Sequence, residues 1–525
     1  MPGKMPTMSR QGNIFFHADF SLWHLLRLAE RLRRRPCTCN DSQIPKAGAL
    51  NWAIFLEFDD GVEWVFRAPC SSYAAAQGFT GRLLASEVAT LKYVREHTSI
   101  PVPEVFHYSP TYENDIGIPF ILMSKAPGHP LAKYDWRTCT HEPSGQSSSA
   151  TLPRVLTNED KKNIMRQLGC YARQLFGLRF PTIGSLFEGD KGYYVDECLS
   201  PGHVLEDRET IEDIPRGPFH QEADYYSSLA AALHLHAEQL PMGHHFLRAP
   251  IPVPQEYPNF AKYYAATDRW NDFAALGGIV ESSMNRLQYC LASQLLQDSI
   301  IPCMVRPVSQ SAPGFPLHHH DISVQNLFVD DDLNITCVID WAFSSTGPPA
   351  QLLATPGLPH PRDLVLDLSL VSAFRFGFET ENRKIGGCVI EPNFWMVGQM
   401  VSRFMRLVNL DALQDYNHLE ALCTLVWEPR TPGEDWDDTN SLPALLATRA
   451  TSHDALILAG ELADDDEAES EIRRREQEYF GAVGAKRLAL AHKVAVAAKM
   501  NPRFVADKRL WRWIDAVTEY YDGEI

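Results

Sequence analysis

The 525-residue sequence lacks several features that mark common classes of protein. It has no run of about 18 apolar residues, which a membrane-spanning helix requires, and no secretory signal pattern. Its eleven cysteines are scattered without repeated CxxC pairs, and Cys37 and Cys39 do not have the spacing of a zinc site. We therefore expect mostly buried, free thiols in a reducing compartment.

Basic residues are also few: 48 Lys and Arg stand against 66 Asp and Glu, which gives a net charge of −18. Nucleic acids and anionic membranes both select basic surfaces, so we expect neither as a partner. A small cationic substrate is compatible with this charge. The location predicted is cytoplasmic. A mitochondrial presequence is the alternative, because Phe20 to Arg35 is amphipathic and ends in three arginines, but Asp19 and Glu30 count against it.

The most informative stretch is the one from Leu317 to Ser344. A short apolar run, 327–329, and a β-branched run, 335–339, flank a turn made of aspartates and an asparagine. Two such runs around an Asp/Asn turn predict a β-hairpin.

Polar residues occupy the outer ends of this predicted hairpin. Asn326 precedes its first strand, Asp340 follows its second, and Asp321 lies on the loop that leads in. Strand pairing would bring an amide and a carboxylate together beside a second carboxylate. Oxygen ligands of this kind suit Mg²⁺, which completes its coordination shell with phosphate and water. The arrangement is typical of phosphoryl transfer.

A second hairpin is predicted nearer the start of the chain. Two β-rich runs, 51–58 and 62–68, flank an Asp-Gly turn, and Arg67 falls near the end of the second.

The segment that follows, 82–97, has a helical period with Leu84, Leu91 and Val94 on its apolar face. Glu87 lies on that face, where an ionised carboxylate needs a partner, and Arg67 is the candidate. The alternative is that Glu87 lies at the edge of the face and reaches water.

Taken together, these residues make the sequence resemble the aminoglycoside phosphotransferase and choline kinase-like family, and in particular its fungal branch. The resemblance extends roughly from Leu50 to Trp341. Its motifs are WVFRAP at Trp64, SEVATLKYV at Ser86, IPVPEV at Ile100, PFILMSKAPGHPL at Pro119, IGSLF at Ile183, GPF at Gly217, HHDISVQNLFV at His319 and VIDW at Val338. The last two are specific in combination, and the others are supporting evidence.

The resemblance implies an α+β, protein-kinase-like two-lobed fold, with a small N-terminal β-sheet lobe containing one main helix and a large, mainly helical C-lobe. The predicted divisions are an N-terminal extension at 1–45, a nucleotide-binding N-lobe at 46–125 and a C-lobe at 126–525 that contains the catalytic loop at 317–344. A capping box at Thr157 and Asp160 predicts the start of a helix in the C-lobe.

The family resemblance also implies roles for single residues, with ATP and Mg²⁺ as cofactors. Asp321 would be the catalytic base or the carboxylate that orients the acceptor hydroxyl. His319 would hydrogen-bond backbone groups around the loop and brace Asp340. Mg²⁺ would be bound by Asn326 and Asp340. The nucleotide-binding residues would be these: Arg67 on the phosphates, Glu87 holding Arg67, and Met123, Ser124 and Ala126 in the linker beside the adenine.

Two departures from the family pattern affect activity more than fold. Arg67 stands where the family has a phosphate-binding lysine, and arginine differs from lysine in shape and hydrogen bonding. There is no GxGxxG before the first hairpin, and only Gly48 lies nearby. The leading hypothesis is a phosphotransferase that moves the γ-phosphate of ATP to a small-molecule hydroxyl. The alternative is a catalytically weak or inactive kinase-like protein that binds nucleotide or acts as a scaffold.

Other interpretations are less favoured. His318, His319 and His320 suggest a transition-metal site, but adjacent residues of a strand point to opposite faces. A protein substrate is disfavoured because a proline-rich run follows IDW in place of an activation segment. An insertion at 138–151, an insertion at 190–218 that is expected to be irregular, and the C-terminal helices are expected to form the acceptor pocket.

Overall fold

The computed structural model describes residues 13–48, 50–70, 77–136, 154–243, 245–248, 280–305, 313–358, 367–411, 415–427, 441–466 and 468–481. The chain divides into two compact units. Unit 1 comprises Met1–Ser200, Pro313–Gly347 and Leu368–Val389, and unit 2 comprises Pro201–Ala312, Pro348–Asp367 and Ile390–Ile525. The division at residues 45 and 125 stays a prediction.

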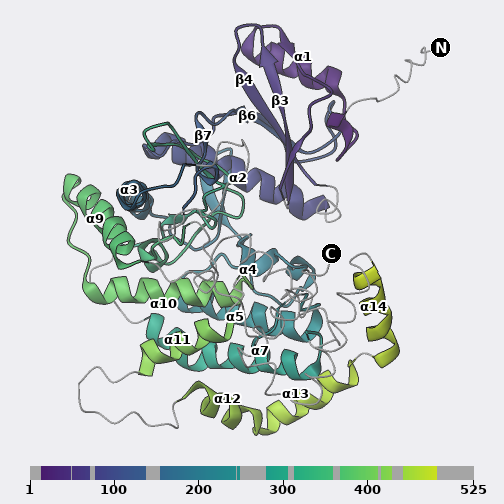
Figure 1. The fold of residues 1–525 in the computed structure, drawn as a ribbon, viewed down its shortest axis with the longest axis vertical. Coiled ribbons are helices and arrows are strands. Elements are labelled where there is room, and N and C mark those ends of the chain that lie inside the picture. The colour runs from purple at the N-terminus through teal and green to yellow at the C-terminus, as the bar shows by residue number, and fades with distance from the viewer. Residues whose placement is uncertain are drawn as a thin grey trace, which may run out of the picture. The chain divides into compact units, whose positions relative to one another are not determined.

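Unit 1 contains an antiparallel sheet with the strand order β1-β3-β4-β6-β5, and β2 pairs with β3. The strands are β1 (Cys37–Thr38), β2 (Lys46–Ala47), β3 (Asn51–Phe58), β4 (Glu63–Pro69), β5 (Val105–Ser109) and β6 (Phe120–Ser124). The predicted Asp-Gly hairpin is confirmed: β3 pairs with β4, and Gly61 closes the turn with a positive φ of 79°. Figure 1 shows β3, β4 and β6 side by side.

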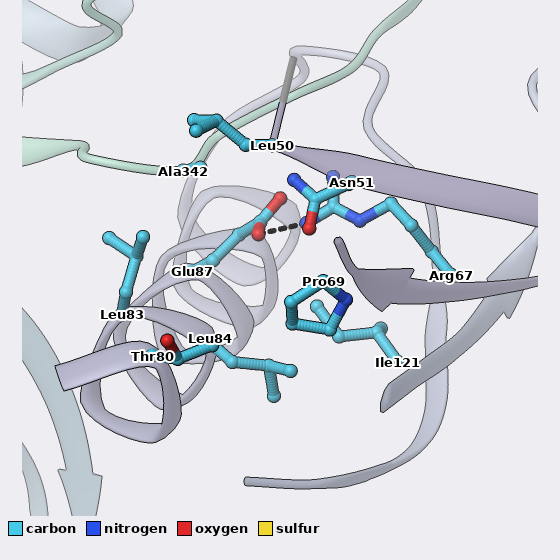
Figure 2. A pocket seen from close by; sticks show the side chains of 10 residues that line it. All are labelled: Leu50, Asn51, Arg67, Pro69, Thr80, Leu83, Leu84, Glu87, Ile121 and Ala342. Atoms are coloured by element: carbon cyan, nitrogen blue, oxygen red, sulfur yellow. Dashed lines mark hydrogen bonds and ion pairs between the residues drawn. The ribbon is translucent and has the colours of Figure 1, made fainter. Parts of the chain in front are cut away.

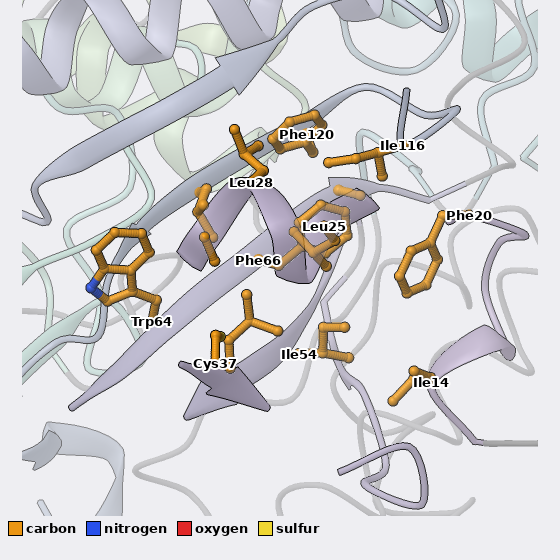
Figure 3. Packing of buried hydrophobic residues seen from close by; sticks show 14 of the residues in the cluster. Ile14, Phe20, Leu25, Leu28, Cys37, Ile54, Trp64, Phe66, Ile116 and Phe120 are labelled. Atoms are coloured by element: carbon orange, nitrogen blue, oxygen red, sulfur yellow. The ribbon is translucent and has the colours of Figure 1, made fainter. Parts of the chain in front are cut away.

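The first face of this sheet is covered by the N-terminal segment. Alternate residues of β3 and β4 are buried there, and the register places Ile54 opposite Phe66 and Leu56 opposite Trp64. Leu25 and Leu28 of α1 (Leu22–Arg33) pack into the same cluster, together with the short helix η1 (Asn13–Phe15) (Figure 3). The sequence showed that this segment is amphipathic, but it did not predict that the segment packs on the sheet.

The opposite face carries α2 (Gln77–His97), which begins five residues before the predicted start. Leu84 and Val88 of α2 pack against Ile121 and Met123 of β6. Arg67 pairs with Ile121 across β4 and β6, so Arg67 lies on the face that α2 covers. Leu91 and Val94 are buried as well, as the predicted helical period requires.

The rest of unit 1 contains the hairpin predicted at 327–339, which we call the catalytic hairpin after its predicted role. The helices are α3 (Asn158–Gly177) and α9 (Leu368–Lys384), with the short helix η2 (Leu131–Lys133). The strands are β7 (His129–Pro130), β8 (Ser185–Gly189), β9 (Gly192–Asp196), β10 (Leu317–His318), β11 (Leu327–Val329), β12 (Ile335–Val338) and β13 (Ser345–Thr346). Thr157 and Asp160 form the predicted capping box of α3.

Helices α3 and α9 cross at close range because glycine lies at the contact on both sides. A Cβ atom at Gly169 would meet the carbonyl oxygen of Phe374 at 2.0 Å, and one at Gly377 would meet that of Arg166 at 2.0 Å. A larger residue at either position would force the helices apart.

The described residues of unit 2 form helices. They are α4 (Pro201–Val204), η3 (Arg208–Thr210), α5 (Glu222–Gln239), α7 (Ser283–Leu295), the π-helical η6 (Leu296–Ile300), α8 (Ile301–Met304), η7 (Pro349–Leu353), α10 (Pro392–Val408), α11 (Asp415–Trp427), α12 (Leu442–Ala450), α13 (His453–Asp464) and α14 (Glu469–Gly481). Tyr226 of α5 meets Phe404 of α10 edge to face at 5.3 Å.

The predicted α+β, protein-kinase-like fold is confirmed: a small antiparallel sheet with one helix on its inner face precedes a mainly helical remainder and a catalytic hairpin. Two expectations need correction. The sheet has a second helix, α1, on its other face. The segment 190–218, expected to be irregular, contains β9, α4 and η3. The segment 138–151 lies outside the described residues.

Among the described residues, no helix is both long enough and apolar enough to cross a membrane.

Candidate active site

The hairpin predicted around the Asp-rich turn is present as β11 and β12, with Leu327 opposite Val338. Its pairing continues beyond the strands, where the backbone N–H of Ile339 donates to the carbonyl oxygen of Asn326 at 2.9 Å. Asn326 and the residue before Asp340 are therefore neighbours, as the sequence predicted.

Asn326 also holds Asp321. Its side-chain nitrogen donates to the Asp321 carbonyl oxygen at 3.0 Å and to the carboxylate Oδ2 at 2.8 Å. Since both amide hydrogens point at Asp321, the amide oxygen of Asn326 is directed elsewhere. Asn326 is buried, whereas Asp321 is exposed.

His319 joins the two sides of this loop. Its Nε2 donates to the carbonyl oxygen of Ile339 at 3.0 Å, and its Nδ1 accepts from the backbone N–H of Asp321 at 3.1 Å. These two partners require the neutral ring with its proton on Nε2. Burial lowers the pKa of His319, against the opposing effects of the Ile339 carbonyl and the carboxylates of Asp321 and Asp340.

Arg67 and Glu87 form the predicted ion pair across β4 and α2, joined by Nη2 and Oε2 (Figure 2). Nη1 of Arg67 lies 3.5 Å from Oδ1 of Asp340, which is 273 positions away in the sequence. The side chains of Arg67 and Glu87 are 13% and 3% exposed, so water barely reaches their contact, whereas Asp340 is 41% exposed. Asp340 thus links the buried pair to the surface of unit 1.

The electrostatics of this cluster follow from its burial. Burial raises the pKa of Glu87, and the Arg67 guanidinium opposes that rise. Burial alone would lower the pKa of Arg67, but the carboxylates of Glu87 and Asp340 outweigh it and the pKa is raised. The alternative that Glu87 sits at the edge of the helix face and reaches water is wrong.

Trp341 explains the aromatic residue of the IDW motif. Its backbone N–H donates to the carboxylate of Glu87, and its indole N–H donates to the carbonyl oxygen of Val338 at 2.9 Å. Its ring meets that of His319 edge to face at 4.7 Å. This buried residue therefore connects the ion pair to the catalytic loop.

The linker residues lie beside the ion pair, because β6 is the neighbour of β4. Met123 is buried and pairs with both Val65 and Val105. Ser124 exchanges two hydrogen bonds with the backbone of Glu104. Ala126, partly buried, follows them. The linker then joins the catalytic hairpin through β7, which pairs with β11.

A small cavity lies next to the ion pair, lined among others by Asn51, Thr80 and Ala342 (Figure 2). Its volume is about 20 Å³, which is room for roughly one water molecule. Asn51, at the start of β3, is a neighbour of Arg67 that no sequence pattern singles out.

The donor set at the hairpin suits a hard cation. The amide oxygen of Asn326 and the half-exposed carboxylate of Asp340 are oxygen donors of the kind that Mg²⁺ accepts, and Mg²⁺ uses few protein ligands when phosphates supply the rest. Within the described ranges, no three His, Cys, Asp or Glu side chains are grouped to hold a metal ion. A nitrogen-rich transition-metal site at the three histidines is disfavoured further, because His319 bonds Ile339 and His320 bonds Ser345.

The pattern of the "Phosphotransferase enzyme family" (APH) matches residues 200–355 of this chain, a range that includes the catalytic hairpin. The resemblance predicted from the motifs is thereby confirmed. The chain is also 28% identical over 361 residues to a subtelomeric hrmA-associated cluster protein in each of two strains of Aspergillus fumigatus. That alignment covers 62% of this chain and 65% of the relative, and it supports the predicted fungal branch.

Solved structures similar to this chain include three small-molecule phosphotransferases. Macrolide 2′-phosphotransferase MphH from Brachybacterium faecium has 16% identity, a TM-score of 0.34 and coverage of 78% of this chain and 100% of its own. Spectinomycin phosphotransferase APH(9)-Ia has 10% identity, a TM-score of 0.34 and coverage of 86% of this chain and 96% of its own. Plasmodium vivax ethanolamine kinase has 9% identity, a TM-score of 0.32 and coverage of 80% of this chain and 84% of its own.

Proposed function

We propose that this chain is a phosphotransferase that uses ATP and Mg²⁺ to phosphorylate a hydroxyl group of a small molecule. The observation that carries the proposal is the joining of Arg67, Glu87 and Asp340 in one contact network beside Asn326 and Asp321. Residues this far apart in the sequence have no structural need to meet at a half-exposed carboxylate. Phosphoryl transfer needs all of them in one place.

Each residue then has a defined task. Asp321, exposed and oriented by Asn326, accepts the proton of the acceptor hydroxyl. Asn326 and Asp340 would hold the metal through oxygen atoms, and Arg67, fixed by Glu87, would bind the phosphates. Met123, Ser124 and Ala126 would bind the adenine through their backbone. When bound, ATP and Mg²⁺ supply the transferable phosphoryl group and neutralise the charge that develops during transfer.

The test of this proposal combines turnover with nucleotide binding. We expect Mg²⁺-dependent phosphate transfer from ATP to a member of a panel of small alcohols and amino sugars. Asp321→Ala should lower kcat by roughly 10²- to 10⁴-fold. Asp331→Ala is the matched control, because Asp331 is an exposed carboxylate in the turn of the same hairpin, and it should retain full activity.

A thermal-shift titration separates this proposal from its alternative. A ligand that binds only the folded protein raises its stability, so ATP with Mg²⁺ should raise the Tm of the wild type but not that of Asp340→Ala. A shift without turnover on any acceptor would favour the nucleotide-binding scaffold. The absence of both would contradict nucleotide binding altogether.

A further inference from the structure

The β8–β9 hairpin packs along α2, the helix that carries Glu87. Lys92 Nζ lies 2.6 Å from Glu188 Oε2, and the Arg82 guanidinium contacts Glu197 and, at 3.3 Å, Asp196. These ion pairs are spread over ten residues of the helix, so the hairpin holds α2 at separated points.

Aromatic contacts reinforce the same surface. The ring of Tyr93 meets those of Tyr193 and Phe180, each at 5.0 Å. The hydroxyl of Tyr193 also donates to Glu96 Oε2 at 3.3 Å. Ion pairs of partly exposed side chains are individually weak, whereas aromatic packing adds a contact that salt does not screen.

The geometry of the helix places these contacts behind Glu87. At 3.6 residues per turn, Arg82, Lys92, Tyr93 and Glu96 lie within about 100° of arc, and Glu87 is on roughly the opposite side. The hairpin therefore packs against the side of α2 that is opposite Glu87, while Glu87 faces Arg67 and the sheet.

The residue just before β8, Gly184, is hydrogen-bonded to Thr346, which follows the predicted catalytic loop. Gly184 and Thr346 exchange hydrogen bonds: the N–H of Gly184 donates to Thr346 Oγ1 at 2.9 Å, and the N–H of Thr346 donates to the Gly184 carbonyl at 2.8 Å. A Cβ atom at Gly184 would lie 1.9 Å from the Asp196 carbonyl oxygen, so only glycine fits. Thr346 belongs to β13, which pairs with β10 at the start of the predicted catalytic loop.

We propose that the β8–β9 hairpin is a brace that fixes α2 relative to the catalytic loop, with Lys92, Arg82 and Tyr93 as positioning residues for Glu87 and, through it, for Arg67. The inference rests on the proposed function, in which Arg67 contacts the phosphates. Because the hairpin contacts α2 along its length and is hydrogen-bonded to β13 next to its base, a loosened contact would let Glu87 and Asp340 move apart. Small displacements of a positioning group reduce turnover strongly.

A charge-swap experiment on Lys92 and Glu188 tests the brace. Lys92→Glu places two carboxylates together, Glu188→Lys places two amines together, and the double variant restores an ion pair in the reversed sense. Arg27→Glu is the matched control, because it creates the same kind of like-charge contact with Glu30 on α1, away from α2. All variants are assayed well below their Tm, so that loss of folded protein does not contribute.

We expect each single swap to lower kcat by about tenfold without changing KM for the acceptor. The double variant should recover to within about twofold of the wild type, and Arg27→Glu should match the wild type. A purely structural role would lower Tm and leave kcat unchanged. Unchanged kcat in the single variants, or no recovery in the double variant, would overturn the proposal.

Hydrogen–deuterium exchange gives a readout that does not depend on activity. In Lys92→Glu, the amides of α2 around Glu87 should exchange faster than in the wild type, and in the double variant they should return to the wild-type rate. Should the wild type prove inactive, the proposed function fails while this comparison still decides whether the hairpin restrains α2. Unchanged exchange in Lys92→Glu would refute the brace in either case.

Discussion

At the scale of single residues, the site depends on a guanidinium that serves two carboxylates at once. Arg67 uses Nη2 for Glu87 and Nη1 for Asp340, which a single ammonium group could not do with the same geometry. The arginine in place of the usual lysine therefore fits this arrangement. Its planar guanidinium connects Asp340 to the sheet through Nη1 while Nη2 holds Glu87.

Removing the charge of Glu87 should destabilise unit 1. Glu87→Gln leaves the buried Arg67 with only the half-exposed Asp340, and we expect the free energy of unfolding to fall by about 3 kcal/mol. Glu57→Gln, the same change at an exposed position of β3, should cost less than about 0.5 kcal/mol. Denaturant unfolding of both variants measures the difference. Equal effects would show that the Arg67–Glu87 pair contributes nothing to stability.

At the scale of elements, the sheet of unit 1 is buried on both faces, because α1 covers one and α2 the other. In α1, Leu25 is fully buried while Leu32, two turns later, is 40% exposed. The N-terminal segment is thus part of the core of unit 1, and it supports the strands that carry Arg67 and the linker.

Shortening Leu25 should therefore weaken the sheet. Leu25→Ala removes a side chain from the cluster around Ile54 and Phe66, and we expect it to cost roughly 2–5 kcal/mol of unfolding free energy. Leu32→Ala is the control on the same helix and should cost under about 1 kcal/mol. Denaturant midpoints of the two variants provide the comparison. A small effect at Leu25 would mean that α1 is dispensable to the sheet.

Local patterns in the sequence predicted the elements that are formed by neighbouring residues. The Asp-Gly hairpin, the catalytic hairpin and the capping box of α3 all depend on a few consecutive positions, and each is present. The Arg67–Glu87 contact was predicted because a carboxylate on a helix's apolar face needs a partner.

Other features depend on contacts between distant segments. The packing of α1 on the sheet and the bonding of Thr346 to Gly184 leave no periodic signal. The β8–β9 hairpin did have a sequence signal, which was missed. Apolar and aromatic residues flank the turn residues Gly189-Asp190-Lys191-Gly192, and this pattern is typical of a hairpin. Its role behind α2 required the structure.

At the scale of the whole molecule, each unit contains histidines that are held neutral. In unit 1, burial and the neighbouring His319 lower the pKa of His320 to about 4. In unit 2, burial and the Arg208 guanidinium lower the pKa of His236 to about 3. His236 Nδ1 accepts from Arg208 Nε at 3.3 Å, so a proton on Nδ1 would face a buried cation.

This burial gives the stability of the protein a defined dependence on pH. Below about pH 6.5 the unfolded chain binds a proton at each of these histidines, whereas the folded chain does not until far lower pH. The contribution of these neutral histidines to the free energy of unfolding is therefore complete above about pH 6.5. It is lost as the pH falls below that value, by roughly 1.4 kcal/mol per pH unit for each histidine.

The pH dependence can be assigned to one residue by comparison with a variant. His236→Gln keeps a side chain that can accept from Arg208 and donate to the carbonyl of Pro241, as His236 does, but it does not titrate. Between about pH 7.5 and about pH 5.5, we expect the wild type to lose about 1.4 kcal/mol more unfolding free energy than this variant. The reason is that the unfolded wild type binds one more proton than the folded protein below about pH 6.5, which is about one pH unit of this range. Denaturant unfolding at both pH values measures the two losses. Equal losses would mean that His236 does not remain neutral in the folded protein.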